Sequence, residues 1–318
     1  MAKYTFLLPA YKSEYLDKAL TSILKQSYND FEIIISDDCS PHNIQHIVNK
    51  YNDKRIIYRK NNVNIGGEKL VKHWNLLLSL CTSQYLIIAA DDDIYESNFL
   101  EDVDNCATRY PDVDIIRART RRINGNDEVI DIEGVYETFE TQLDAFYNSL
   151  YSDQIWCIGN YVFKTEALKH KGGFIDFPYA WFSDLATALM MSEKGICYTH
   201  KYGFNFRLSE RNISNTRRNK IIDRQKLYAT ISFGEWLSCF YDKIISTNEI
   251  VSTRRKAKVI HKADSLIYSH IGDHGWSIGF YELIKIYHRI KKWPSFSNFC
   301  FIKNYTLAAL ARRIGKYA

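Results

Sequence analysis

The sequence predicts an α/β fold, in which helices flank a mostly parallel sheet and a helical region follows at the C-terminus. Three observations predict it. Short apolar runs alternate with segments of helical periodicity through the first 90 residues, which is typical of a parallel sheet with right-handed crossovers. Two of these apolar runs end in consecutive carboxylates. From residue 221 onward the pattern is helical.

The first half of the chain is expected to alternate strands and helices. Its expected strands are short apolar runs, which suit strands buried on both faces of a sheet. Ser13 and Pro41 can begin the first two helices, because Ser caps a helix N-terminus and Pro fits the first turn. In chain order, the expected strands are residues 4–8, 31–36, 55–58 and 86–90, and the helices between them are residues 14–26, 41–51 and 70–80.

The second half is expected to be less regular. Residues 119–136 are polar and predict an irregular segment, whereas residues 155–163 are apolar and aromatic. A helix over residues 185–194 is expected to open at Asp184. The other expected elements are strands at 113–117 and 196–200, helices at 99–110, 139–150, 165–170, 221–241, 253–270 and 281–291, and a helical tail from residue 304.

Composition bounds the class of protein. A chain of 318 residues with 46% hydrophobic residues can bury a large core and allows one or two domains. Its seven cysteines are scattered with no CxxC pair, which indicates free thiols in a reducing compartment and no zinc site. No run of about 18 apolar residues occurs. We therefore expect a cytoplasmic protein that at most lies peripherally on the inner face of a membrane.

Charge divides the chain near residue 219. Residues 1–219 carry a net charge of −5, whereas residues 220–318 carry +10. We therefore expect a first domain over residues 1–219 and a basic helical region over residues 220–318. This mixture of cations and aromatic residues is typical of interfacial helices and predicts contact with an anionic membrane surface; a solvated helical surface is the alternative. The basic clusters are residues 254–256, 291–293 and 312–313.

Three consecutive carboxylates, Asp91 to Asp93, follow the expected strand at residues 86–90. Ligands of open α/β sheets bind at the carboxyl ends of strands. Adjacent carboxylates repel one another unless a cation or hydrogen-bond donors compensate them. Carboxylate oxygens suit hard cations, so the expected ion is Mg²⁺ or Mn²⁺, completed by waters and a substrate phosphate. The alternative is a solvated turn in which Asp93 or Ser97 caps the next helix.

Several motifs together resemble the family 2 inverting glycosyltransferases, which use nucleotide-diphospho-sugars on a GT-A fold. They are LLPAY at residues 7–11, SILKQSYNDFEIIISDDCS at 22–40, NxG at 64–66, AADDDIY at 89–95 and GGFIDFPYAWFSDLA at 172–186. The resemblance covers roughly residues 3–210 in the family's order. It implies a GT-A-type, Rossmann-like, mostly parallel sheet. Its nucleotide-sugar half would span about residues 1–118 and its acceptor half about residues 119–219.

The resemblance implies roles for residues on several loops. Tyr11 would stack on the nucleotide base, and Asp38 would accept a hydrogen bond from the base, which favours uracil. Asp92 is the implied direct metal ligand, and Asp93 is assigned to the metal with it. Many members have Asp where this chain has Ala90, so the acids here fall on the three positions after it. The implied nucleotide-binding residues are Pro9, Ala10, Tyr11, Asp38, Asn64, Gly66, Lys72 and Asp91, with Lys69 and Arg207 as further cations for the diphosphate.

Asp184 falls where the family keeps its general base. Members usually have a Glu-Asp pair there, whereas Ser183 precedes Asp184, so one acid is available. Departure of a nucleoside diphosphate leaves negative charge on the β-phosphate, which a metal can neutralise. A carboxylate on the opposite side can take the proton of the acceptor hydroxyl as it attacks the anomeric carbon, which gives inversion. Helix capping is the alternative for both Asp38 and Asp184.

These patterns predict a metal-dependent, inverting glycosyltransferase of the hexosyltransferase type. It would move a sugar from a UDP-sugar to a hydroxyl of a glycan or lipid-linked acceptor in bacterial surface polysaccharide synthesis. Two alternatives stay open: a metal-dependent phosphohydrolase, and a non-catalytic nucleic-acid or interaction module that uses the basic tail. The sequence contains no P-loop, no Rossmann glycine fingerprint and no RNA-binding motif, so no nucleic-acid partner is expected.

Overall fold

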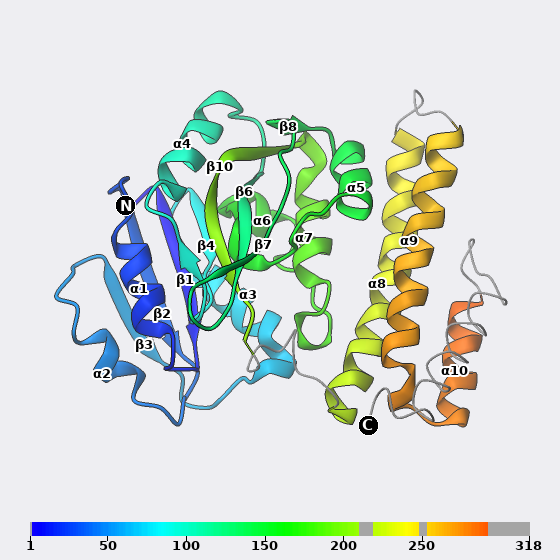
Figure 1. Ribbon diagram of the computed structural model, residues 1–318, viewed down its shortest axis with the longest axis horizontal. Coiled ribbons are helices and arrows are strands. Elements are labelled where there is room, and N and C mark those ends of the chain that lie inside the picture. The colour runs from blue at the N-terminus through cyan, green and yellow to red at the C-terminus, as the bar shows by residue number, and fades with distance from the viewer. Residues whose placement is uncertain (1, 210–218, 248–252, 292–318) are drawn as a thin grey trace. The chain divides into compact units, whose positions relative to one another are not determined.

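The computed structural model describes residues 2–209, 219–247 and 253–291 (Figure 1). The chain forms two compact units. Within the described residues, the first unit comprises residues 2–148, 152–176 and 183–209. The second takes residues 149–151 and 177–182 together with the helices from residue 219 onward. Two short segments from the middle of the chain therefore belong to the C-terminal unit, which charge and periodicity did not indicate.

The first unit is built on a mixed sheet (Figure 1). Ten strands are described, and the central order is β3-β2-β1-β4-β9-β6-β10-β5, with β7 paired to β6 and β8 paired to β10. The strands are β1 (Tyr4–Ala10), β2 (Phe31–Asp37), β3 (Ile56–Lys60), β4 (Tyr85–Ile88), β5 (Ile94–Tyr95), β6 (Ile115–Ile123), β7 (Val129–Ile132), β8 (Phe139–Glu140), β9 (Tyr161–Lys164) and β10 (Ile196–Arg207). Strands β1 to β4 are the four expected in the first half, and they run parallel.

The parallel register brings the acidic strand ends together. Ala10, the last residue of β1, pairs with Asp37 at the end of β2, and Leu7 pairs with Ile88 at the end of β4. The Ala89 N–H continues this pairing by donating to the Leu7 carbonyl at 2.9 Å. The carboxylates that follow β2 and β4 therefore lie at the same edge of the sheet, on either side of the loop after β1.

Helices connect these strands (Figure 1). They are α1 (Leu16–Leu24), α2 (Ile44–Val48), η1 (Gly67–Lys69), α3 (Leu70–Leu80), α4 (Phe99–Arg109), α5 (Gln142–Tyr151), α6 (Thr165–His170) and α7 (Ser183–Met191). The expected caps are wrong for the first two. Helix α1 is preceded by Tyr15 without a side-chain cap, and α2 is capped by Asn43, whose side chain accepts from the His46 N–H. The Asn43 side-chain oxygen can accept this bond, whereas Pro41 has no side-chain acceptor.

The core of the first unit is rich in aromatic rings. Tyr95 on β5 contacts Phe6, Phe99 and Phe204, with ring centroids 5.1, 4.7 and 4.9 Å apart. All four side chains are buried. Such edge-on pairs add stability beyond the burial of area, by about 0.5–1.5 kcal/mol each. These ring contacts hold β5 in place, and β5 directly follows the acidic triplet at residues 91–93.

The second half departs from the expected irregularity. Strand β6 extends to Ile123 and pairs with β7, within a segment expected to form no strand. Strand β9 runs antiparallel to both neighbours, β4 and β6, which makes the sheet mixed on this side. The arginines of β6 concealed its alternation, and every residue of β7 is exposed, so neither strand shows an apolar face in the sequence.

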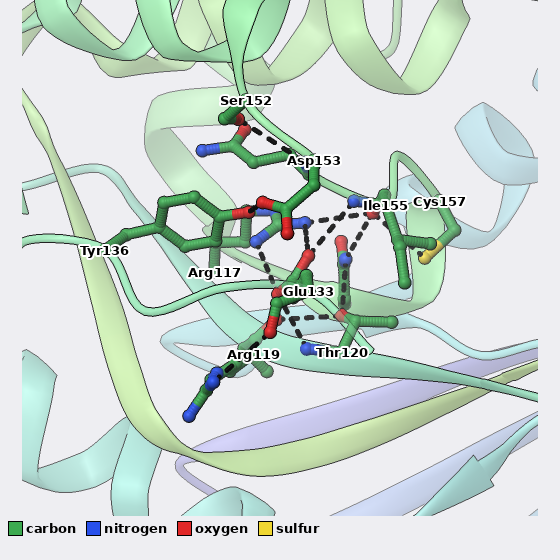
Figure 2. A network of polar contacts seen from close by, with 12 residues as sticks. Arg117, Arg119, Thr120, Glu133, Tyr136, Ser152, Asp153, Ile155 and Cys157 are labelled. Atoms are coloured by element: carbon green, nitrogen blue, oxygen red, sulfur yellow. Dashed lines mark hydrogen bonds and ion pairs between the residues drawn. The ribbon is translucent and has the colours of Figure 1, made fainter. Parts of the chain in front are cut away.

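A buried ion pair joins Arg117 of β6 to Glu133 (Figure 2). The Glu133 carboxylate accepts from Arg117 Nη1 and Nη2 at 2.9 and 2.7 Å, and from the Thr120 and Ile155 N–H groups at 2.7 and 3.0 Å. Arg117 Nη2 also donates to the Ile155 carbonyl at 2.9 Å. Both charged side chains are fully buried. Glu133 therefore joins β6 to the segment that begins at Ile155.

The second unit consists of helices that hold a short aromatic segment. Helices α8 (Lys220–Thr247) and α9 (Thr253–His274) pack side by side, followed by α10 (Phe280–Ile290) (Figure 1). The Phe182 ring stacks on Phe233 of α8 at 4.4 Å, and Trp181 lies 5.8 Å from His270 of α9. Phe182 has a φ of 66°, a conformation that is costly without glycine. Packing against these helices holds it there.

In the part of the chain that the structure describes, no helix combines the length and the apolar character that crossing a bilayer requires. Two expectations concern residues that lie outside the described part of the chain. The tail from residue 304 and the cluster at residues 312–313 lie outside the described residues, as do Lys292, Trp293 and the side chains of residues 254–256.

Candidate active site

Asp91 fastens the loop after β1 to the acidic triplet. Its Oδ2 atom accepts from the backbone N–H groups of Tyr11 and Lys12 at 2.9 and 2.7 Å. The carboxylate is buried, and burial raises its pKa while Lys12 and these two donors oppose the rise. Tyr11 is 45% exposed. The triplet thus shapes the loop after β1 and leaves Tyr11 at the surface, as stacking on a base would require.

Asp93 is held by Arg207 at the end of β10. The Arg207 N–H donates to Asp93 Oδ1 at 2.8 Å, and its Nε donates to the Asp92 carbonyl at 2.6 Å. Burial, with the Asp92 charge next in size, raises the pKa of Asp93 well above its usual range. Asp93 therefore joins the triplet to the end of β10.

Arg207 is held by residues of the turn between β6 and β7. Its side chain is fully buried, Nη2 pairs with Asp127 Oδ1 at 2.5 Å, and Nη1 donates to the Asn124 carbonyl at 2.8 Å. The guanidinium also lies 4.2 Å from the centroid of the Tyr15 ring. Arg207 therefore joins this turn to the triplet, and its expected contact with a diphosphate stays a prediction.

Lys12 is the cation that the sequence interpretation missed. Its Nζ hydrogen-bonds to Asp92 Oδ2 and lies 3.4 Å from Asp91 Oδ1. Burial lowers the pKa of Lys12, but the charges of Asp91 and Asp92 outweigh it and the pKa is raised. The residue follows Tyr11 directly. The rule that adjacent carboxylates need a nearby cation could have indicated it once the loop after β1 was assigned to this edge.

Asp38 organises the loop at residues 61–66. Its carboxylate accepts from the N–H groups of Ile65 and Gly66 at 2.9 and 3.0 Å and from Asn61 Nδ2 at 3.0 Å. Its carbonyl accepts from Asn64 Nδ2 at 2.7 Å. The φ of Gly66 is +78°, which favours glycine. The expected nucleotide residues Asp38, Asn64 and Gly66 are therefore brought together, and the helix-cap alternative for Asp38 is not observed.

Helix α3 connects this loop to the segment before the candidate base. Asn75 Oδ1 accepts from the Phe174 N–H at 2.8 Å, and the Ile175 N–H donates to Thr187 Oγ1 of α7 at 3.0 Å. Lys72, one turn earlier on α3, is exposed. Burial raises the pKa of Asp176, and the charge of Lys72 opposes this rise. Lys72 therefore presents an accessible cation near Asp176, and exposed Lys69 precedes α3.

Asp184 lies in the first turn of α7. Its Oδ1 atom accepts from the Leu185 N–H at 2.8 Å, and its side chain is partly buried. Burial raises the pKa of Asp184 to about 6, with the hydrogen bond from Leu185 opposing the rise. A carboxylate with this pKa is largely ionised at neutral pH and still basic enough to accept a proton, which suits a general base.

Cys157 lies in a segment that is tied to the strand after the triplet. Burial raises the pKa of its thiol, and the charges of Asp93 and Asp184 both raise it further. The neighbouring carbonyl of Gly159 accepts from the Tyr95 hydroxyl at 2.9 Å, which ties the same segment to the strand after the triplet. The segment at residues 155–161 is therefore held against β5, the strand that follows the triplet. Sequence reasoning gave it no role, because its apolar residues indicate only core.

A divalent ion fits the chemistry of this edge. Asp92 supplies carboxylate oxygens of the kind that Mg²⁺ and Mn²⁺ take. Among the residues described here, no group of three or more Asp, Glu, His or Cys side chains is arranged to hold a metal. An ion at Asp92 would therefore need oxygens from elsewhere, and the phosphates of a bound nucleotide are the natural source.

The fold defines an α/β protein whose acidic strand ends meet at one edge of a mixed sheet. A family model described as glycosyl transferase family 2 matches residues 5–182, and the chain belongs to this family. The resemblance that the motifs indicated is thereby confirmed.

Three curated relatives share part of the sequence. Poly(ribitol-phosphate) beta-N-acetylglucosaminyltransferase TarS of Staphylococcus aureus is 27% identical over 129 residues, which are 39% of this chain and 22% of TarS. Glycosyltransferase GlyG of Streptococcus pneumoniae is 32% identical over 100 residues, 30% of this chain and 32% of GlyG. UDP-Glc:alpha-D-GlcNAc-diphosphoundecaprenol beta-1,3-glucosyltransferase WfgD of Escherichia coli is 28% identical over 98 residues, 30% of this chain and 38% of WfgD. Each match spans less than half of the relative.

A solved structure extends the likeness of the fold along the chain. The crystal structure of S. aureus TarS residues 1–349 in complex with UDP-GlcNAc aligns with a TM-score of 0.60 at 17% identity. It covers 98% of this chain and 92% of that chain. The expected fold class, a GT-A-type α/β sheet with a helical C-terminal region, is confirmed.

Proposed function

We propose that this protein is an inverting glycosyltransferase that transfers a sugar from a UDP-sugar to a hydroxyl of a glycan or lipid-linked acceptor in the assembly of a bacterial surface polysaccharide. Family membership supports transfer of a sugar. TarS and WfgD are named for N-acetylglucosamine and glucose transfer, and a TarS structure contains UDP-GlcNAc, which supports a UDP-sugar donor.

One observation carries the proposal. Helix α3, which follows the loop of Asn64 and Gly66, holds Phe174 through Asn75, and the next residue, Ile175, donates to Thr187 of α7. Hydrogen bonds therefore join the proposed nucleotide loop to the helix whose first turn carries Asp184, which supports a donor site and a general base that act on one displacement. A hydrolase that used the triplet alone would need no base on Asp184.

The roles follow from the placement of each residue. Tyr11 stacks on the base, while Asp38 fixes the loop of Asn64 and Gly66 around the nucleotide. Asp91 holds the loop of Pro9 and Ala10 in place. Lys72 is an exposed cation available to the diphosphate. These assignments are proposals, each resting on the contacts given above.

Asp184 accepts the proton of the acceptor hydroxyl as the oxygen attacks the anomeric carbon. The bond to the nucleoside diphosphate breaks on the opposite face, so the configuration inverts. Asp92, assisted by Asp93, would hold a divalent ion, which when bound would neutralise charge on the departing diphosphate.

Calorimetric titration tests the donor class. UDP, GDP and CDP are titrated into the full chain with and without Mn²⁺, and into Asp92→Ala. We expect UDP to bind best, more tightly with Mn²⁺, and the metal effect to be lost in Asp92→Ala, because that variant lacks the carboxylate that would share the ion with the diphosphate. Failure of all three nucleotides to bind would refute the proposal.

Vesicle flotation tests the proposed membrane surface. The net charge of +10 over residues 220–318 predicts binding to vesicles that contain anionic lipid and none to neutral vesicles. Raising the salt concentration should weaken this binding, because it is electrostatic. A variant with Arg254, Arg255 and Lys256 replaced by Ser is the comparison. If the full chain does not bind anionic vesicles at low salt, the proposed membrane surface is refuted.

A further inference from the structure

Lys12 stands where a cation of the acidic triplet would be expected. Its ammonium hydrogen-bonds to Asp92 Oδ2 and lies 3.4 Å from Asp91 Oδ1. The two carboxylate side chains are 7% and 6% exposed. A positive charge within about 4 Å of two buried carboxylates offsets the repulsion between them.

The three carboxylates differ in the hydrogen-bond donors, other than Lys12, that stabilise their negative charge. Asp91 Oδ2 accepts two backbone N–H groups, and Asp93 Oδ1 accepts the Arg207 N–H. Within the described residues, the hydrogen bond that the Asp92 carboxylate receives comes from Lys12. Asp92 is thus the member that depends most on the ammonium, and it is also the member that we assign to a metal.

The loop allows Lys12 to leave without unfolding. Its backbone N–H remains bonded to Asp91 at 2.7 Å, which fixes the main chain. Its side chain is 31% exposed, so rotation about the side-chain bonds can carry the ammonium into solvent. Exchange between ammonium and another cation at Asp92 therefore needs only a side-chain movement.

We propose that Lys12 is the resident counter-cation of the triplet, and that a divalent ion binds Asp92 only by displacing the Lys12 ammonium. The proposal deepens the proposed function, because it rests on Asp92 as the metal ligand. It assigns Lys12 a positioning role: it sets how tightly the site holds a metal, and it keeps the triplet ordered before the ion and its nucleotide arrive.

Metal affinity without nucleotide provides the test. Mn²⁺ is titrated into the full chain at constant ionic strength and followed by the electron paramagnetic resonance signal of free Mn²⁺. Lys12→Met removes the ammonium and keeps an unbranched side chain. Lys50→Met is the matched control, because Lys50 pairs with Asp17 at 3.4 Å on an exposed surface and has the same charge.

We expect Lys12→Met to bind Mn²⁺ at least tenfold more tightly than the wild type, Lys50→Met to bind it as the wild type does, and Asp92→Asn added to Lys12→Met to abolish the gain. Thermal unfolding gives a second readout: Mn²⁺ should stabilise Lys12→Met more than it stabilises the wild type. Unchanged or weaker Mn²⁺ affinity in folded Lys12→Met would overturn the proposal. UDP binding that persists in that case leaves the proposed function intact, whereas tighter Mn²⁺ binding without any nucleotide binding removes the proposed function alone.

Discussion

Replacing Asp184 by Asn should lower sugar transfer by 10²- to 10⁴-fold while UDP binding stays unchanged. The substitution keeps the size of the side chain and an acceptor for the Leu185 N–H, but it removes the group that takes the proton, and general-base catalysis contributes about this factor. In the wild type, kcat/KM should fall below pH 6, about tenfold per pH unit, because the pKa of Asp184 is raised to about 6 and the carboxylate must be ionised. Initial rates with a UDP-sugar and an acceptor measure both effects.

The stability of the same variant separates catalysis from folding. Because folding raises the pKa of Asp184 from 3.8 to about 6, ionised Asp184 destabilises the folded state above pH 6, and this cost fades as pH falls toward 4. Asp184→Asn should therefore be more stable than the wild type at pH 8, by about 1–3 kcal/mol, and equally stable near pH 3. Asp144→Asn, in the first turn of α5, is the control. Transfer above a tenth of the wild-type rate in Asp184→Asn would exclude it as the base.

Replacing Glu133 by Ala should destabilise the protein by about 3–5 kcal/mol, a large share of the 5–15 kcal/mol that stabilises a typical domain. The substitution leaves the buried Arg117 guanidinium without its carboxylate and removes the acceptor of the Thr120 and Ile155 N–H groups (Figure 2). Urea unfolding followed by circular dichroism measures the loss. Activity should fall as well, since Ile155 begins the segment whose Gly159 carbonyl accepts from Tyr95, on the strand after the triplet.

Two further variants distinguish the buried pair from surface charges. Asp131→Ala removes an exposed ion pair with Arg122, 2.6 Å long, and should cost less than about 1 kcal/mol. Arg117→Met combined with Glu133→Leu removes both buried charges and should recover much of the stability that Glu133→Ala loses. A double variant as unstable as Glu133→Ala would show that packing and the lost acceptor of the Thr120 and Ile155 N–H groups, and not the unpaired charge, dominate the loss.

The sequence allowed the parallel half of the fold to be predicted, because each of its strands is a short apolar run with a clear boundary. It also placed Asp38 and the triplet at one edge, since the ends of parallel strands coincide. Contacts between residues far apart in the chain could not be predicted from the sequence. Arg207 is 114 residues from Asp93 in sequence, and only the β10 register shows that it supports the triplet. Lys12 was overlooked because a lone lysine in a loop ordinarily indicates a solvated surface. Strand β7 has no apolar face to reveal it.

Residues 177–182 belong to the helical unit, although in sequence they lie between two segments of the first unit. This limits where the chain can be cut into separate domains. The stacking partner of Phe182 is Phe233, and Trp181 lies against His270, both encoded more than 50 residues later. A chain cut near residue 219 would keep these two aromatic side chains and lose their partners, just before the residue proposed as base. A chimaera that takes its helical region from a relative should therefore also take residues 177–182 from that relative. The aromatic segment and the helices then come from the same protein.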